Sequence, residues 1–220
     1  MQIALEIAAL WAAFTATHLG LASARVEHPL RARLGNNAFL GLYSLVALAI
    51  FVPLVRLYFT HRHAGEWLWA IPLGPGLRAA LYAGMTVGLV LSVGALVKPS
   101  PAAVAPGSAE VAGIYRVTRH PLVLGLALIW ALHLIPNASA ADVAFFGGFV
   151  AFSLAGAWHQ DARKLAAPPP GFAAFHGATA FLPFTRADAL RGLREVQPWV
   201  WALGLAAAAA VRWLHPRGLW

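Results

Sequence analysis

The chain has 220 residues, of which 60% are hydrophobic and 11% are charged, and its formal net charge is +8. Apolar runs of membrane-spanning length with few or no charges recur along it, so the composition indicates a polytopic membrane protein and excludes an ordinary soluble domain. Cysteine is absent, which excludes disulfides, thiolate metal ligands and covalent haem attachment through paired cysteines.

The apolar runs predict an all-α fold: one transmembrane domain over residues 1–220 that is a bundle of about six helices. The six predicted spans are residues 3–21, 38–58, 79–97, 121–134, 141–158 and 200–214. The first run has Glu6 near its start, no basic segment before it and no clear cleavage site. We therefore expect it to be a retained span and not a signal peptide.

The basic residues predict an orientation. Loops after the first, third and fifth spans carry eleven Lys and Arg residues, against five on the other side. Because cytoplasmic loops are enriched in Lys and Arg, both termini are expected in the periplasm of a bacterial inner membrane. The same rule explains the positive net charge without nucleic-acid binding.

The fourth and fifth spans have distinct features. The fourth, between Pro121 and Leu134, is only about 20 Å long at the helical rise, against a hydrocarbon core of about 30 Å. Pro121 suits the first helical turn and Pro136 ends the helix. In the fifth span, Gly147, Ala151 and Ala155 form a small-residue stripe that predicts close packing of a neighbouring helix.

His18 is the first candidate cofactor ligand. On one helix it would share a face with Trp11, Phe14 and Arg25. An imidazole beside aromatic rings, with an arginine about two turns away near a propionate, suits an axial ligand to haem. The alternative is a histidine hydrogen-bonded to a neighbouring helix.

Three further histidines enter the candidate cofactor site. His133 lies in the apolar fourth span, and its presence together with His18 favours ligation, since neutral imidazole is a common haem and metal ligand. His120 follows two arginines at the interface, where a structural or phosphate-contacting role is equally expected. His159 has Asp161 close by and suits a supporting or helix-end role. His18 paired with His159 or His120 stays open.

Four segments, THLGLASAR, GIYRVTRHPLVLG, WALHL and GAWHQDARK, together resemble the NnrU family of bacterial membrane proteins. That family is similar to the zeta-carotene cis-trans isomerase, a haem b enzyme. The resemblance implies non-covalent haem b, held by axial histidines that fall on His18 and His133. It also implies a link to denitrification, with a small gaseous ligand such as nitric oxide, or isomerisation of a carotenoid-like polyene.

Two readings compete with haem. The YRVTRHP and GFAAFHGATAFLPF segments also resemble membrane methyltransferases that use S-adenosylmethionine, but Gln160, Asp161 and Ala162 stand where those enzymes have paired glutamates. The other reading is a non-catalytic assembly factor or sensor. Membrane lipid is an expected partner in every case, and no residue indicates a particular protein partner.

Overall fold

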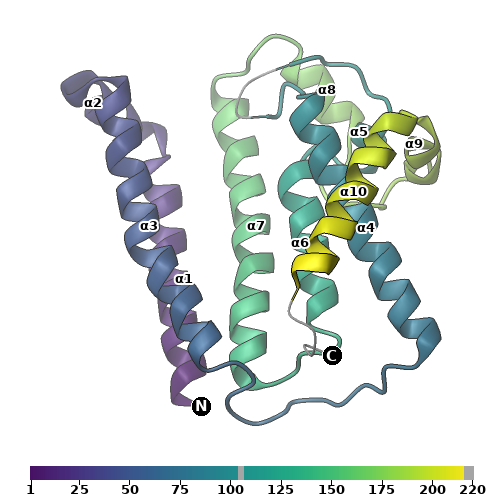
Figure 1. The fold of residues 1–220 in the computed structure, drawn as a ribbon. Helices are drawn as coiled ribbons and strands as arrows, with labels where there is room; N and C mark the ends of the chain where they lie inside the picture. The colour runs from purple at the N-terminus through teal and green to yellow at the C-terminus, as the bar shows by residue number, and fades with distance from the viewer. Residues whose placement is uncertain (104–106, 216–220) are drawn as a thin grey trace. The chain divides into compact units, whose positions relative to one another are not determined.

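The computed structural model describes residues 1–103 and 107–215, and the regular structure in these residues is helical. The long or apolar helices are α1 (Gln2–Leu21), α3 (Asn36–Thr60), α4 (Pro75–Val97), α6 (Pro121–His133), α7 (Ala140–Ala166) and α10 (Pro198–Leu214). The short ones are α2 (Ala24–Leu34), α5 (Ile114–Val117), α8 (Phe172–Ala178) and α9 (Ala189–Glu195). Each predicted span is a helix, so the all-α membrane fold is confirmed (Figure 1).

The membrane-spanning lengths differ between these helices. Four of them, α1, α3, α4 and α7, are long and apolar enough to cross a membrane. The helix α6 has 13 residues and α10 has 17, so α6 covers about 20 Å, as its sequence predicts. Its first residue is Pro121, whose missing N–H would have no helical partner there in any case.

The described residues form two compact units, one from residues 1–71 and 133–152 and the other from residues 72–132 and 153–220. In the first unit α1 and α3 lie side by side (Figure 1). Trp11 of α1 is nearly fully buried and donates its indole N–H to the carbonyl of Phe145 at 3.1 Å. Its ring also meets Phe149 edge-on, with 4.5 Å between centroids, so aromatic packing holds this unit together.

Glycine positions show how closely the helices approach. In the first unit a Cβ on Gly148 would lie 2.1 Å from Trp11 Cδ1, whereas Gly147 has nothing within 4 Å and Ala151 is exposed. The predicted stripe of Gly147, Ala151 and Ala155 is therefore wrong at its first two positions, whereas Ala155 is half-buried. The packing glycine is Gly148, because it faces a tryptophan that needs the room.

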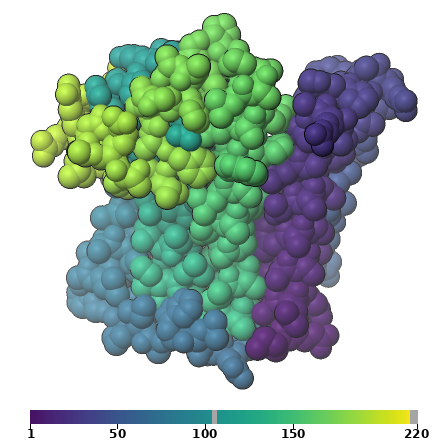
Figure 2. All heavy atoms as spheres, turned by 180° about the vertical axis from the view of Figure 1, so that it is seen from behind, coloured from purple at the N-terminus to yellow at the C-terminus, as the bar shows by residue number. Residues whose placement is uncertain are grey.

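The second unit is built around α4. Gly204 of α10 packs against Val90 of α4, where a Cβ would lie 2.4 Å from the valine Cγ2. Val90 belongs to a buried cluster with Tyr115, Phe172 and Phe175. Figure 2 shows the yellow-green segment around α9 covering the teal segment around α5, of which few atoms reach this face.

One predicted boundary differs from the structure. The fifth span was expected to end at Trp158, but α7 continues for two further turns to Ala166, and the loop that follows contains the short helices α8 and α9. The first span ends at Leu21, as predicted, but a separate helix then starts at Ala24. Between them Ser23 is extended, with ψ of 140°, and its carbonyl accepts the amide of Glu27 at 2.8 Å, as suits an N-cap residue.

Candidate functional site

His18 lies in the last turn of α1 in an aromatic setting. Its ring centroid is 4.7 Å from that of Tyr43, 5.1 Å from that of Phe14 and 5.3 Å from that of Phe152. The ring atom Nδ1 is buried and has no hydrogen-bond partner among the described residues. Because a buried polar atom without a partner costs about 1–3 kcal/mol, this imidazole suits a ligand that the chain itself does not supply.

Arg25 does not continue the face of His18. The helix α1 stops before it, and Arg25 lies exposed near the start of α2. The spacing of seven residues places two side chains on one face only within a single helix. The expected pairing of His18 and Arg25 through one helical face is therefore wrong, because the break at Ser23 separates them.

His133 is the last residue of α6 and lies against a different ring of α7. Its centroid is 5.2 Å from that of Phe146, whereas His18 contacts Phe152. These phenylalanines are six residues apart in one helix, which corresponds to about 9 Å along the axis and about 120° around it. The structure therefore places the two imidazoles beside different turns of α7, and their joint ligation of one iron stays a prediction.

His120 binds a carboxylate instead. It precedes α6, its side chain is buried, and its Nε2 lies 2.7 Å from Asp161 Oδ1. Its backbone amide is also bound, because it donates to the hydroxyl of Thr118 at 3.2 Å. The geometry thus supports the structural role that the sequence left open for His120.

Two other groups complete a polar cluster around Asp161, which we call the Asp161 cluster and define as Arg119, His120, Asp161 and His176. Arg119 Nε donates to Asp161 Oδ2 at 2.7 Å, and its Nη2 lies 2.7 Å from the same oxygen. His176 Nε2 lies 3.7 Å from that oxygen. Sequence reasoning did not assign Arg119 or His176 to the site, although a charged residue inside an apolar chain is a signal for one.

His159 lies outside this cluster. It precedes Asp161 by two positions in α7, so the two side chains leave the helix about 200° apart. Its neighbour Gln160 donates to the carbonyl of Ala102 at 2.6 Å. The carboxylate near His159 was noticed in the sequence, but its partner is His120, 41 residues away.

The cluster borders a groove of about 590 Å³ that is lined by Arg119, Leu154, Trp158, Asp161, Ala162, Leu165, His176 and Phe181. A groove of this size is within the range of small-molecule sites. Its polar groups gather at Arg119, Asp161 and His176, and the other lining residues are apolar. The guanidinium of Arg119 also lies over the ring of Phe181, 5.2 Å from its centroid.

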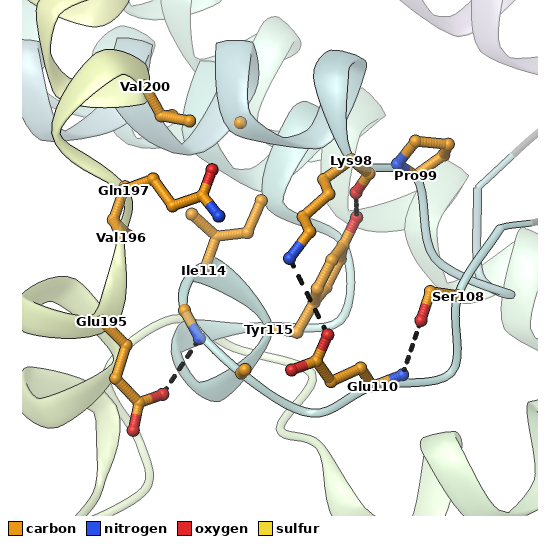
Figure 3. A pocket seen from close by; sticks show the side chains of 13 residues that line it. Lys98, Pro99, Ser108, Glu110, Ile114, Tyr115, Glu195, Val196, Gln197 and Val200 are labelled. Atoms are coloured by element: carbon orange, nitrogen blue, oxygen red, sulfur yellow. Dashed lines mark hydrogen bonds and ion pairs between the residues drawn. The ribbon is translucent and has the colours of Figure 1, made fainter.

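A second pocket, of about 210 Å³, is lined by Lys98, Tyr115 and Glu195 among others (Figure 3). Its charged groups are already paired: Lys98 with Glu110 at 3.7 Å, and Glu195 with the amide of Gly113 at 3.1 Å. Burial raises the pKa of Tyr115 to about 12, so it stays a neutral donor to the carbonyl of Lys98. A ligand would have to displace these pairs, which makes this pocket the weaker candidate.

A second buried carboxylate, Asp142, lies in the first unit at the start of α7 and is fully buried. It accepts from Tyr58 Oη at 3.0 Å and from the amide of Ser139 at 3.2 Å, and it pairs with His63 Nδ1 at 2.9 Å. Its own amide donates to Ser139 Oγ at 3.1 Å, which closes a capping box. Within residues 1–103 and 107–215, no group of three or more His, Cys, Asp or Glu residues is placed to hold a metal ion.

Known proteins resemble this chain along most of its length. It is 29% identical over 184 residues to a 15-cis-zeta-carotene isomerase, chloroplastic, of Arabidopsis thaliana, and 26% identical over 181 residues to the protein of the same name from Zea mays. Each alignment covers 78% of this chain and 47% of the relative, so the chain spans about half the length of these curated relatives. No solved structure matches it. The model of the family described as NnrU protein matches residues 6–218, and the chain belongs to this family.

Proposed function

We propose that this membrane protein binds haem b with His18 as an axial ligand and catalyses the cis-trans isomerisation of an extended apolar polyene. The observation that carries the proposal is the imidazole of His18, which lies among three aromatic rings with its Nδ1 unpartnered. The similarity to proteins named 15-cis-zeta-carotene isomerase over 78% of the chain supports the reaction class.

The residues around His18 suit haem in two respects. The rings of Phe14, Tyr43 and Phe152 give an apolar wall that would exclude water from one face of the macrocycle. Tyr43 also donates its hydroxyl to the carbonyl of His18 at 3.3 Å, which fixes the end of α1 next to the ring. When bound, haem would supply an iron whose coordination can change with its oxidation state.

His133 is the predicted second ligand, and its contact with Phe146 puts it on a different turn of α7. A bis-histidine site would therefore need α1 and the end of α6 to approach each other more closely than these contacts indicate. The link to denitrification rests on the family resemblance and stays a prediction. This link is tested by adding nitric oxide to the purified protein, because nitric oxide bound to haem changes the absorption spectrum.

The experiment compares wild type with His18→Ala and with His28→Ala, a matched control at an exposed histidine of α2. Each protein is expressed with ample haem and purified in detergent. Haem per chain is then measured by absorption in the Soret region, and turnover of a 15-cis polyene is followed by chromatography. We expect His18→Ala to lose haem and turnover together, and His28→Ala to keep both.

Three results contradict parts of this proposal. Wild-type protein without a Soret band would overturn haem binding. Haem retained at full stoichiometry and with an unchanged spectrum in His18→Ala would exclude His18 as a ligand. A haem protein that binds nitric oxide but never isomerises the polyene would support the nitrogen-oxide prediction instead. His133→Ala, measured beside these, decides whether His133 is the second ligand.

A further inference from the structure

We propose that the groove beside the Asp161 cluster binds one membrane lipid with an anionic head group, with the phosphate or carboxylate of the lipid on Arg119 and His176. This site uses none of the residues assigned to haem and goes beyond the isomerase proposal. It is carried by two observations in the second unit: the leftover guanidinium donors of Arg119, and the apolar walls of the groove.

The first observation concerns hydrogen-bond capacity. Asp161 already accepts from Arg119 Nε and Nη2 and from His120 Nε2, and His176 lies 3.7 Å away. Its oxygens are therefore occupied by the chain itself. Arg119 Nη1 also donates to the carbonyl of Thr179 at 3.1 Å. Three of the five N–H groups of its guanidinium are therefore used, and two remain.

These leftover donors decide the chemistry of the ligand. Arg119 lines the groove together with His176, so the donors left over there are the guanidinium N–H groups of Arg119, to which a neutral His176 adds at most one ring N–H. A head group that matches them must offer several acceptor oxygens, as phosphate and carboxylate do. A hydroxyl or an amine would leave the guanidinium without full pairing.

Charge does not oppose this assignment. The guanidinium of Arg119 balances the carboxylate of Asp161, with Nη2 at 2.7 Å from Oδ2, so an arriving anion meets no unbalanced carboxylate in the cluster.

The apolar walls indicate that the anion belongs to a lipid. Trp158 is 68% exposed and Leu165 is 52% exposed, and both line the groove. They belong to α7, one of the helices long and apolar enough to cross a membrane, and Trp158 is the last residue of the predicted span 141–158, so both side chains are placed to meet lipid near the membrane interface. The groove thus joins a polar end to a surface on which a hydrocarbon chain can lie, and basic pockets between membrane helices are known to take lipid head groups.

The test is native mass spectrometry of the detergent-purified full chain, titrated with dioleoyl phosphatidic acid, with dioleoylglycerol, which has the same chains and no phosphate, or with inorganic phosphate. We expect one phosphatidic acid to bind saturably, about tenfold more tightly than dioleoylglycerol, which is the effect of one charge-assisted hydrogen bond. Inorganic phosphate alone should bind far more weakly, because it lacks the chain that fills the apolar part.

Two variants locate the lipid. Ala162→Trp places a large ring in the groove at an exposed position and removes no polar group, so it should abolish saturable binding. Ala151→Trp is the matched control, since Ala151 is an exposed alanine about three turns earlier on nearly the same face of α7. His176→Gln should weaken the binding of phosphatidic acid several-fold and leave that of dioleoylglycerol unchanged.

Four results would overturn the proposal: equal affinity for the two lipids, equal affinity for lipid and free phosphate, undiminished binding in Ala162→Trp, or equal loss in Ala151→Trp. Haem content and polyene turnover are measured in the same samples. Loss of lipid binding in Ala162→Trp with haem and turnover intact would separate this site from the proposed function. If the wild-type protein binds no haem, the proposed function fails, but the measured lipid binding still supports the lipid site, because the two sites share no residue.

Discussion

The two halves of α7 bury one carboxylate each, and they do so in different ways. In the half that belongs to the first unit, Asp142 is fully buried and its partners are the neutral hydroxyl of Tyr58, a backbone amide and His63. In the other half, Asp161 is 5% exposed and its main partner is the guanidinium of Arg119. Both carboxylates are satisfied, and Asp161 also lines the groove of about 590 Å³.

This difference separates structural groups from groups available to a ligand. The contacts of Asp142 with Tyr58 of α3, with His63 in the turn after α3 and with Ser139 before α7 hold these chain segments together. Around Asp161 the guanidinium has more donors than the carboxylate and the Thr179 carbonyl use. Burial of a carboxylate is therefore a poor sign of a binding site, and surplus donors beside a groove are a better one.

The largest expected effect is at Asp142. Asp142→Ala would leave the Tyr58 hydroxyl and the Ser139 amide without an acceptor in a buried place and would remove the capping box of α7. We expect a loss of about 3 kcal/mol of stability, and a decrease in melting temperature on the order of 10 °C in detergent. Thermal unfolding followed by circular dichroism measures it.

Glu6→Ala is the control for this prediction, because Glu6 is an exposed carboxylate that accepts a hydrogen bond from the exposed side chain of Gln2. It should change the melting temperature by about 1 °C at most. If Asp142→Ala were as stable as Glu6→Ala, the carboxylate of Asp142 would not fasten the first unit, and the contrast with Asp161 would lose its basis.

The next effect tests how tightly the first half of α7 packs against Trp11 of α1. In Gly148→Ala the new methyl group would lie about 2 Å from the indole of Trp11, so the tryptophan or the helix must move. Overpacking of this kind costs about 1–3 kcal/mol. In Gly147→Ala the methyl group meets open space, and the variant should gain up to about 1 kcal/mol, because alanine is the better helix former. Opposite signs of the two shifts in melting temperature are the expected result, and equal shifts would contradict the packing described.

Much of the fold could be predicted from the sequence, because the apolar runs are long and proline marks their ends. Pro121 begins α6 as expected, and Pro136 follows its last turn. The end of the first span at Leu21 was predicted, but the new helix from Ala24 was not, since the segment around Ser23 still matches a helical spacing. Nothing in that spacing shows that one carbonyl will instead accept the first amides of a new helix.

The candidate site was harder to predict than the fold. His18 was singled out because an imidazole in an apolar helix is costly, and the structure does leave its Nδ1 without a partner among the described residues. The partner of His120 is separated from it by 41 residues, and His176 lies farther still along the chain. Helical periodicity relates residues within one helix. It therefore cannot predict contacts between residues of different segments, such as those of His120 and His176 with Asp161.

The smallest expected effect is at a third carboxylate, Glu195, which lies outside the membrane-spanning helices. It accepts from Arg116 Nε at 2.7 Å, from the amide of Gly113 at 3.1 Å and from Arg191 Nε at 2.8 Å. Gly113 has φ of +58°, a conformation that favours glycine, and it presents that amide to the carboxylate. The hydrogen bond from Arg116, followed by that from Gly113, holds the pKa of Glu195 at about 2, below its usual value of 4.5.

A lowered pKa in the folded state stabilises the protein fully above the unfolded pKa, and this contribution is lost as the pH falls from about 4.5 towards 2. Glu195→Gln removes the charge but keeps an oxygen for the Gly113 amide. We expect it to lower the melting temperature at pH 7 by on the order of 2 °C, and the difference from wild type should shrink steadily below pH 4.5. A difference that stays constant down to pH 2.5 would mean that shape and not charge accounts for the contribution of Glu195. Of the three carboxylates compared, Glu195 is the least buried, so its effect should also be the one that high salt weakens.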